Sequence, residues 1–344
     1  MTRFRHVLLA CVLLAACDGN PFIETDPGTD PGTDPGTGID SDRVLPPGTT
    51  SPSRNRSIFR REPKSDNDGQ SGNGYIEDVA YDQASDTFSV DGLAFDGGNV
   101  YDRGTAVGSL GPFAVYEADT TFNDSVTGTP ISQFGHRAIY GISTSGDTEF
   151  AVVRTGAYVP YGYGGFVYQR NGSVTLPTSG QAHYAGEYSA LRDFDGKGGL
   201  EYANGEMTID IDFNDFNEGA GVDGVIFNRA IYDINGEDIT SDVIDAINTE
   251  HDASLTALPV LRFAVGPKAL DSNGEIVGKL NSYVQKDDGS TSQYEEGSYY
   301  AVISGDATAG GQDEIVGIIV IEAEDARVDG VTVRETGGFL LYRD

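Results

Sequence analysis

The segment Met207-Thr208-Ile209-Asp210-Ile211-Asp212-Phe213 alternates strictly between apolar and polar side chains. Because successive side chains of a β-strand point to opposite faces, this pattern predicts a strand with one apolar and one polar face. Other short strands are predicted at Phe150–Arg154, Gly165–Gln169, Tyr184–Leu191, Gly224–Tyr232, Val260–Val265, Ile276–Val284, Ser298–Ser304, Ile315–Ile321 and Gly338–Arg343. The sequence therefore indicates an all-β fold.

Turn-forming stretches rich in Gly, Asn and Asp separate these strands, which favours antiparallel hairpins in a sandwich or barrel. We divide the folded part near Pro177–Gly180, into a first β region at 75–180 and a second at 181–344. The second region holds about eight strands, enough to close a small barrel whose interior side chains fill it. Alternation alone does not tell which barrel face points outward. The charged faces of Asp210 and Asp212 favour a soluble barrel over a membrane-spanning one.

One helix is predicted after the strand at Gly224–Tyr232. Thr240 or Ser241 is the expected N-cap, and Val243, Ile244 and Ile247 share one apolar face. We expect this helix either to lie in a loop or to cover one end of the barrel.

The N-terminus has the organisation of a secretory signal. Arg3 and Arg5 precede an apolar run, Val7–Ala16, which is too short for a membrane-spanning helix of roughly 20 residues. The run ends in Leu-Ala-Ala-Cys, which resembles a bacterial lipobox. That resemblance implies cleavage before Cys17, so that residues 1–16 are a lipoprotein signal peptide, and diacylation of the Cys17 thiol. An ordinary signal peptide with a coincidental cysteine is the alternative.

Cysteine usage supports the lipid anchor. Cys11, the only other cysteine, lies inside the segment that cleavage would remove, which leaves Cys17 no partner for a disulfide or a metal site. The predicted location is the bacterial outer membrane, on its surface or periplasmic side. Asp18 directly after the cysteine favours retention at the inner membrane under the sorting rule of enteric bacteria, so the inner membrane is the alternative location.

Residues 17–74 are predicted to be a disordered tether. Glu24–Gly38 contains three copies of Thr-Asp-Pro-Gly, which form turns but supply no side chains for a core. Five basic residues gather further along, at Arg54, Arg56, Arg60, Arg61 and Lys64. They are expected either to contact anionic lipid headgroups or to dock on the acidic domain of the same chain.

The chain is strongly acidic, with 22 Lys and Arg against 54 Asp and Glu and a formal net charge of −32. This charge repels nucleic acid, which is excluded as a partner, and favours cations or basic protein patches. Solubility of an exported protein is the simpler explanation of the same acidity.

A pattern of Gly and aromatic residues in the second region resembles a known family. It includes His183–Tyr188, Asp195–Gly199, Gly221–Ile226, Glu314–Val320 and Glu335–Phe339. These motifs resemble surface lipoproteins of the transferrin-binding protein B and factor H-binding protein group. The resemblance implies a handle-type β region followed by a soluble eight-stranded antiparallel β-barrel, after a lipobox and tether. No residue here matches a known ligand contact of that group, so host-protein binding is not carried over.

Catalytic and cofactor motifs are absent from the sequence. His136, His183 and His251 lack metal-ligand spacing, and neither a G-x-S-x-G motif nor a P-loop occurs, so we predict no catalytic residues, no enzyme activity and no cofactor. One acidic cluster offers oxygens for Ca²⁺, as the alternative to a solvated strand face, and comprises Asp210, Asp212, Asp215 and Glu218.

The stretch Tyr158–Phe166 is the strongest candidate for a contact surface. Tyr158, Tyr161, Tyr163 and Phe166 lie among glycines, a composition that binding loops use. Alternatively, these rings cover an open end of a β-domain. We therefore expect a membrane-anchored lipoprotein that acts as a non-catalytic binding module for an unknown protein or solute. A periplasmic carrier of a small ligand or Ca²⁺ is the alternative.

Overall fold

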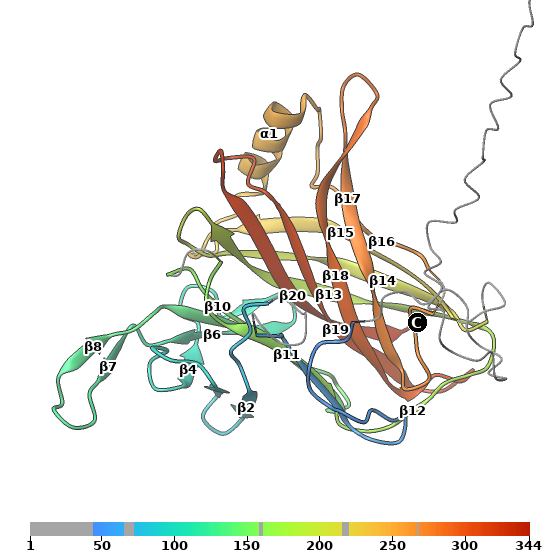
Figure 1. Cartoon of the computed structure of the whole chain (residues 1–344), viewed down its shortest axis with the longest axis horizontal. Helices are drawn as coiled ribbons and strands as arrows, with labels where there is room; N and C mark the ends of the chain where they lie inside the picture. Colours follow the sequence, from blue (N-terminus) through green and yellow to red (C-terminus); the bar gives the residue numbers. More distant parts are fainter. Residues whose placement is uncertain (1–43, 65–71, 158–160, 215–219, 267) are drawn as a thin grey trace, which may run out of the picture.

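The computed structural model describes residues 44–64, 72–157, 161–214, 220–266 and 268–344. These residues form two nine-stranded sheets, a separate two-stranded hairpin and one helix (Figure 1). The predicted all-β class is confirmed.

The second sheet closes into a barrel. In the order of their pairing its strands are β12 (Val174–Thr175), β18 (Thr291–Asp306), β17 (Glu275–Gln285), β16 (Leu261–Phe263), β15 (Gly221–Tyr232), β14 (Glu201–Asp212), β13 (Gln181–Asp195), β20 (Thr332–Arg343) and β19 (Asp313–Glu324). Antiparallel pairing of β18 with β19 closes the ring of β13 to β20, while β12 runs parallel to the end of β18. The predicted eight-stranded antiparallel barrel is therefore confirmed.

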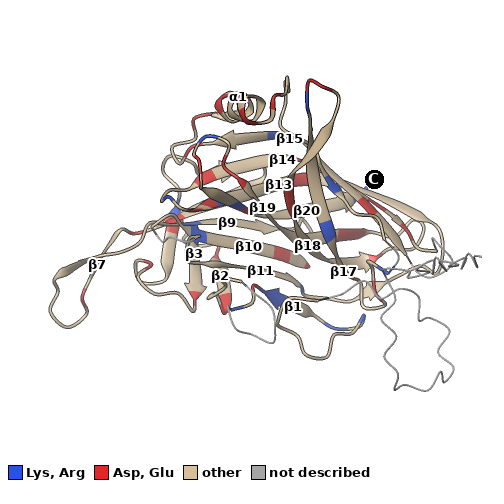
Figure 2. Cartoon of the chain, turned by 45° about the horizontal axis from the view of Figure 1, so that its top comes forward, with Lys and Arg blue, Asp and Glu red and all other residues tan. Residues whose placement is uncertain are grey.

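The first sheet is open and curls against the barrel (Figure 2). In the order of their pairing its strands are β1 (Ile58–Arg61), β11 (Gly165–Arg170), β10 (Thr148–Thr155), β9 (His136–Ile142), β6 (Phe113–Ala118), β4 (Val100–Arg103), β3 (Thr87–Asp91) and β2 (Asp78–Asp82), with β5 (Ser109–Leu110) beside β6. The hairpin of β7 (Thr121–Asn123) and β8 (Pro130–Ser132) projects between β6 and β9. The predicted division at 177–180 falls between β12 and β13.

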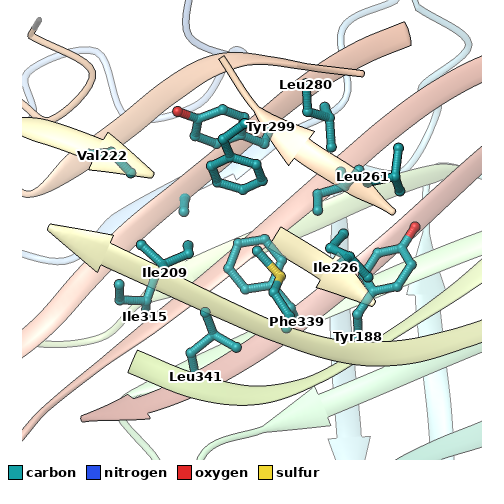
Figure 3. Close-up of a cluster of buried hydrophobic side chains, with 14 of the residues drawn as sticks. Tyr188, Ile209, Val222, Ile226, Leu261, Leu280, Tyr299, Ile315, Phe339 and Leu341 are labelled. Atoms are coloured by element: carbon teal, nitrogen blue, oxygen red, sulfur yellow. The ribbon is translucent and has the colours of Figure 1, made fainter. Parts of the chain in front are cut away.

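Alternation along the strands determines what fills the barrel. Met207, Ile209 and Ile211 on β14 are buried in the barrel interior, while Asp210 between them is exposed. Figure 3 shows the same inward direction for side chains of the other strands, such as Tyr299 and Phe339. The interior is thus a packed apolar core.

A second apolar layer joins the two sheets. Phe150 and Val152 on β10 pack against Val316, Ile318 and Leu340 on the outer wall of the barrel. Strands β19 and β20 are therefore buried on both faces, which explains why Ile315–Ile321 is apolar almost without alternation.

The predicted helix exists as α1 (Thr240–His251), and its Val243 and Ile247 join the apolar core of the barrel. The predicted cap is wrong, because Ile239 occupies the N-cap position and makes no side-chain cap. Thr240 instead uses its hydroxyl to bind the backbone of Ile231 on β15, which fixes the start of the helix to the barrel wall. Within the described ranges, no helix has both the length and the apolar character needed to cross a membrane.

The structure corrects the predicted tether at 17–74, because residues 44–64 belong to the folded part. β1 pairs with β11 along its whole length. Arg60, 5% exposed, forms an ion pair with Glu275 on β17, with Nε 2.7 Å from Oε1. Of the two expectations for the basic patch, docking on the chain's own acidic domain is therefore found for Arg60. The remaining tether residues 17–43 and the Cys17 site lie outside the described residues.

Candidate functional site

Of the described residues in the aromatic stretch predicted as a contact surface, Tyr161 and Phe166 lie in the junction between the two sheets. Phe166 is only 2% exposed and stacks near Tyr300 of the barrel, so it is not a surface contact. Alternation in the sequence correctly predicted the strand that carries Phe166, which is β11. The alternation did not reveal that the barrel covers this face of the first sheet. Tyr158 lies outside the described residues.

Tyr161 and Tyr163 are half-buried. The Tyr161 hydroxyl lies 2.8 Å from that of Thr332, and the guanidinium of Arg334 lies 4.2 Å from the centre of its ring. The Tyr163 ring packs on Tyr75, 4.4 Å away between centres. Tyr161 thus contacts barrel strand β20, whereas Tyr163 packs in the core of the first sheet, and the role of both rings in partner contact stays a prediction.

The predicted acidic cluster is only partly described. Asp210 and Asp212 lie on the outer face of β14, where Asp210 pairs with His183 at 2.7 Å and Asp212 accepts a hydrogen bond from Gln181 at 2.9 Å. That hydrogen bond lowers the pKa of Asp212. Asp215 and Glu218 lie outside the described residues. Among the residues that the structure covers, no three potential ligands come together, so a metal site stays a prediction.

A groove of about 950 Å³ runs between the N-terminal segment and the outer wall of the barrel. Its lining includes Glu62, Asn73 and Arg334, and Glu62 pairs with the fully buried Arg154 at 2.7 Å. Burial lowers the pKa of Arg154, but the charges of Glu62 and Asp193 outweigh this and raise it. Arg154 on β10 also donates to the Thr336 hydroxyl on β20 at 3.1 Å, so this ion pair of the first sheet is hydrogen-bonded to the barrel.

Charged residues also occupy one end of the barrel interior. Arg229 binds both carboxylate oxygens of Glu295, at 2.7 and 2.8 Å, and lies 3.3 Å from Glu335. Glu335 in turn accepts a hydrogen bond from Tyr188 at 2.9 Å. Burial opposes ionisation of Glu295, but Arg229 outweighs it and lowers the pKa of this carboxyl. Each of these buried charges therefore has an opposite charge beside it, which offsets part of the cost of burial.

Five exposed apolar side chains lie on the β7–β8 hairpin and on the neighbouring part of the first sheet. We call Phe95, Val100, Phe122, Val126 and Ile131 the hairpin surface; their exposed fractions are 57%, 49%, 44%, 90% and 41%. Phe122 and Ile131 are directly paired across the two strands. The Phe122 ring also covers Gly98, where a Cβ would come within 2.5 Å of it. This contact joins the hairpin to the loop that carries Phe95.

The hairpin tip is ordered by Asp124. One of its carboxylate oxygens accepts hydrogen bonds from the backbone of Val126 and Thr127, at 3.0 and 2.6 Å, and from the Thr127 hydroxyl at 2.9 Å. These bonds lower the pKa of Asp124. Val126 is thus held at the tip with its side chain in solvent, although an exposed apolar group gains nothing for folding.

Sequence reasoning missed the hairpin surface. β7 and β8 are only three residues each, which is too short for an alternating pattern to be recognised. The available signal was the turn-forming segment Asp124–Gly128 between two apolar residues, Phe122 and Ile131, which is typical of a hairpin with a longer loop.

The chain is similar to several solved structures at low sequence identity. One similar solved structure is a double mutant of transferrin-binding protein B from Haemophilus parasuis Hp5, at 13% identity and a TM-score of 0.36, covering 78% of this chain and 45% of that one. Another is intact Ap-TbpB with its N and C lobes, at 12% identity and a TM-score of 0.35, covering 84% and 53%. The chain spans about half the length of these proteins.

The resemblance drawn from the sequence motifs implied a β region followed by an eight-stranded barrel, and the described residues form an open sheet followed by such a barrel. No protein-family model matches the chain, and no curated protein matches it.

Proposed function

We propose that the chain is a non-catalytic binding module, held at a membrane through a lipid on Cys17, which contacts its partner through the hairpin surface. The observation that carries this proposal is the projecting hairpin, which exposes Phe122, Val126 and Ile131 on an ordered turn. Exposed apolar side chains that rise together from a rigid scaffold are typical of protein contact surfaces.

The barrel supports this proposal over a carrier that holds a solute inside the barrel. Its interior is filled by apolar side chains, among them Ile209, Tyr299 and Phe339. The charged residues at one end, such as Arg229, are bound to one another. A calcium site on the outer face of β14 remains the second candidate, since Asp210 and Asp212 lie there side by side along the strand.

The position of the hairpin suits a tethered module. The first described residue, Val44, lines the groove beside Lys279 on β17. Figure 2 shows β7 and β17 towards opposite ends of the molecule. The described fold therefore begins at the end away from the hairpin, and an anchor before Val44 is compatible with a hairpin surface that is free for a partner.

The anchor is tested by labelling with radioactive palmitate. We expect incorporation into the full chain and none into a Cys17→Ala variant; labelling that survives the substitution would contradict the anchor.

The contact surface is tested by placing a photo-crosslinking amino acid at Val126 in intact cells, with Val328, an exposed valine between β19 and β20, as the matched control. Discrete adducts from position 126 alone are expected, whereas equal adducts from both positions, or none, would overturn the assignment.

A further inference from the structure

The charged residues on and beside the hairpin surface are acidic. Asp119 and Asp124 lie on or beside it, and residues 93–100 and 119–135 contain no Lys, Arg or His. In Figure 2 the hairpin that bears β7 shows no blue segment. The surface is therefore apolar with an acidic margin.

The nearest basic residues do not offset this charge. Arg103 pairs with Asp86 at 2.8 Å, and Arg137 pairs with Glu117 at 3.3 Å. Both guanidinium groups are thereby neutralised within the first sheet. The charges that the hairpin presents to a partner are therefore those of its own carboxylates.

The turn is already in its final form before a partner arrives. Asp124 Oδ1 fixes the backbone from Val126 to Thr127, and the backbone of Gly128 donates to the Asp124 carbonyl at 2.8 Å. A contact made by such a turn loses little conformational entropy on binding. The hairpin is thus suited to enter a preformed pocket as a rigid element.

Resting on the proposed function, we propose that the partner is a protein or peptide surface with an apolar pocket, flanked by Lys or Arg side chains. Val126 fills the pocket, while Asp124 and Asp119 face the basic groups. Opposite charges at the margin of an apolar contact accelerate association and select the partner.

Charge argues against the other occupants. An anionic lipid surface is repelled by a chain with a net charge of −32. A second copy would bring two acidic margins together at the same contact, which is equally unfavourable at low salt. The negative charge of the chain and of the hairpin margin instead attracts a partner that carries Lys or Arg.

The test is selection of a phage-displayed library of random 12-residue peptides on the immobilised full chain at low salt. We expect enriched peptides that combine Lys or Arg with aromatic or aliphatic residues. Their binding should fall at least tenfold in a Val126→Ser, Ile131→Ser double variant, whereas the matched Val328→Ser control keeps it. Asp124→Asn, which retains the oxygen that orders the turn but removes the charge, should weaken binding and flatten its salt dependence.

Each other outcome is decisive. Enriched peptides that bind the double variant as well as the wild type would overturn the hairpin as the contact surface. Enriched peptides that need the hairpin but lack basic residues would overturn the inferred partner chemistry and leave the proposed function standing. If vesicles of anionic phospholipid bind the full chain through the hairpin, the membrane is the occupant and the inference fails. A library that yields no binder above the bare support would contradict the proposed binding function itself.

Discussion

Arg60 and Glu275 form a two-pronged ion pair across 215 residues of chain, with Nε to Oε1 at 2.7 Å and Nη2 to Oε2 at 2.9 Å. Arg60 also donates to the backbone carbonyls of Pro46 and Thr49, both at 3.1 Å. This one side chain therefore connects the N-terminal segment, the edge of the first sheet and the barrel.

Removal of one partner of this pair should strongly destabilise the fold. Arg60→Ala removes the two-pronged ion-pair partner of Glu275, whose side chain is 0% exposed, and the expected loss is about 3–5 kcal/mol of unfolding free energy. Urea denaturation measures it. The matched control is Lys64→Ala, whose ion pair with Glu77 is half-exposed and should cost less than about 1 kcal/mol. Equal losses in the two variants would show that the Arg60 ion pair does not hold the segment in place.

Gly338 should be indispensable for docking of the first sheet on the barrel. A Cβ at this position would come within 2.0 Å of the Phe150 ring, which is itself held edge-on against Phe113. Gly338→Ala is expected to cost about 1–3 kcal/mol or more through overpacking. Thermal unfolding compares it with Gly172→Ala, where a Cβ meets nothing within 4 Å. A melting temperature unchanged by Gly338→Ala would contradict the packing of β10 on β20.

His136 should make stability depend on pH. The side chain is fully buried among the rings of Tyr101, Phe134 and Tyr163, and burial lowers its pKa from 6.5 to about 4. Because the unfolded chain takes up a proton at higher pH than the folded one, this contribution is complete above pH 6.5 and is lost as the pH falls towards 4. The loss is about 1.4 kcal/mol for each unit of pKa difference.

The readout for His136 is the change in unfolding free energy between pH 7.5 and pH 5, measured with urea. His136→Phe removes the titrating group, so its change over this interval should be smaller than that of the wild type. Phe134→Leu, which destabilises the same cluster without altering a titrating group, should keep the wild-type change. If His136→Phe also retains the full change, other groups cause the pH dependence.

Much of the barrel was predictable because its information is local. The alternation of Met207–Phe213 sets which side chains enter the core, and the structure buries Ile209 and Ile211 while it exposes Asp210. Turn residues between such strands then favour antiparallel neighbours. The count of about eight such strands predicted the barrel, and the resemblance in glycines and aromatic residues implied a handle-type β region before it.

The failures have a common physical cause, which is contact between segments distant in sequence. Nothing near Arg60 indicates Glu275, so composition alone assigned the segment to a tether. Phe166 lies on a strand as predicted, but its face is covered by the barrel. The hairpin surface was missed because Phe122 and Ile131 lie on strands too short to show a period.

The central claim is that the β7–β8 hairpin is the surface that meets a partner. The most direct test is amide hydrogen exchange of the full chain, measured by mass spectrometry with and without a saturating peptide from the selection. The account predicts new protection at residues 119–134, centred on Val126, and unchanged exchange at 161–166 and along β14. Protection at 161–166 or along β14 with none at the hairpin would contradict it.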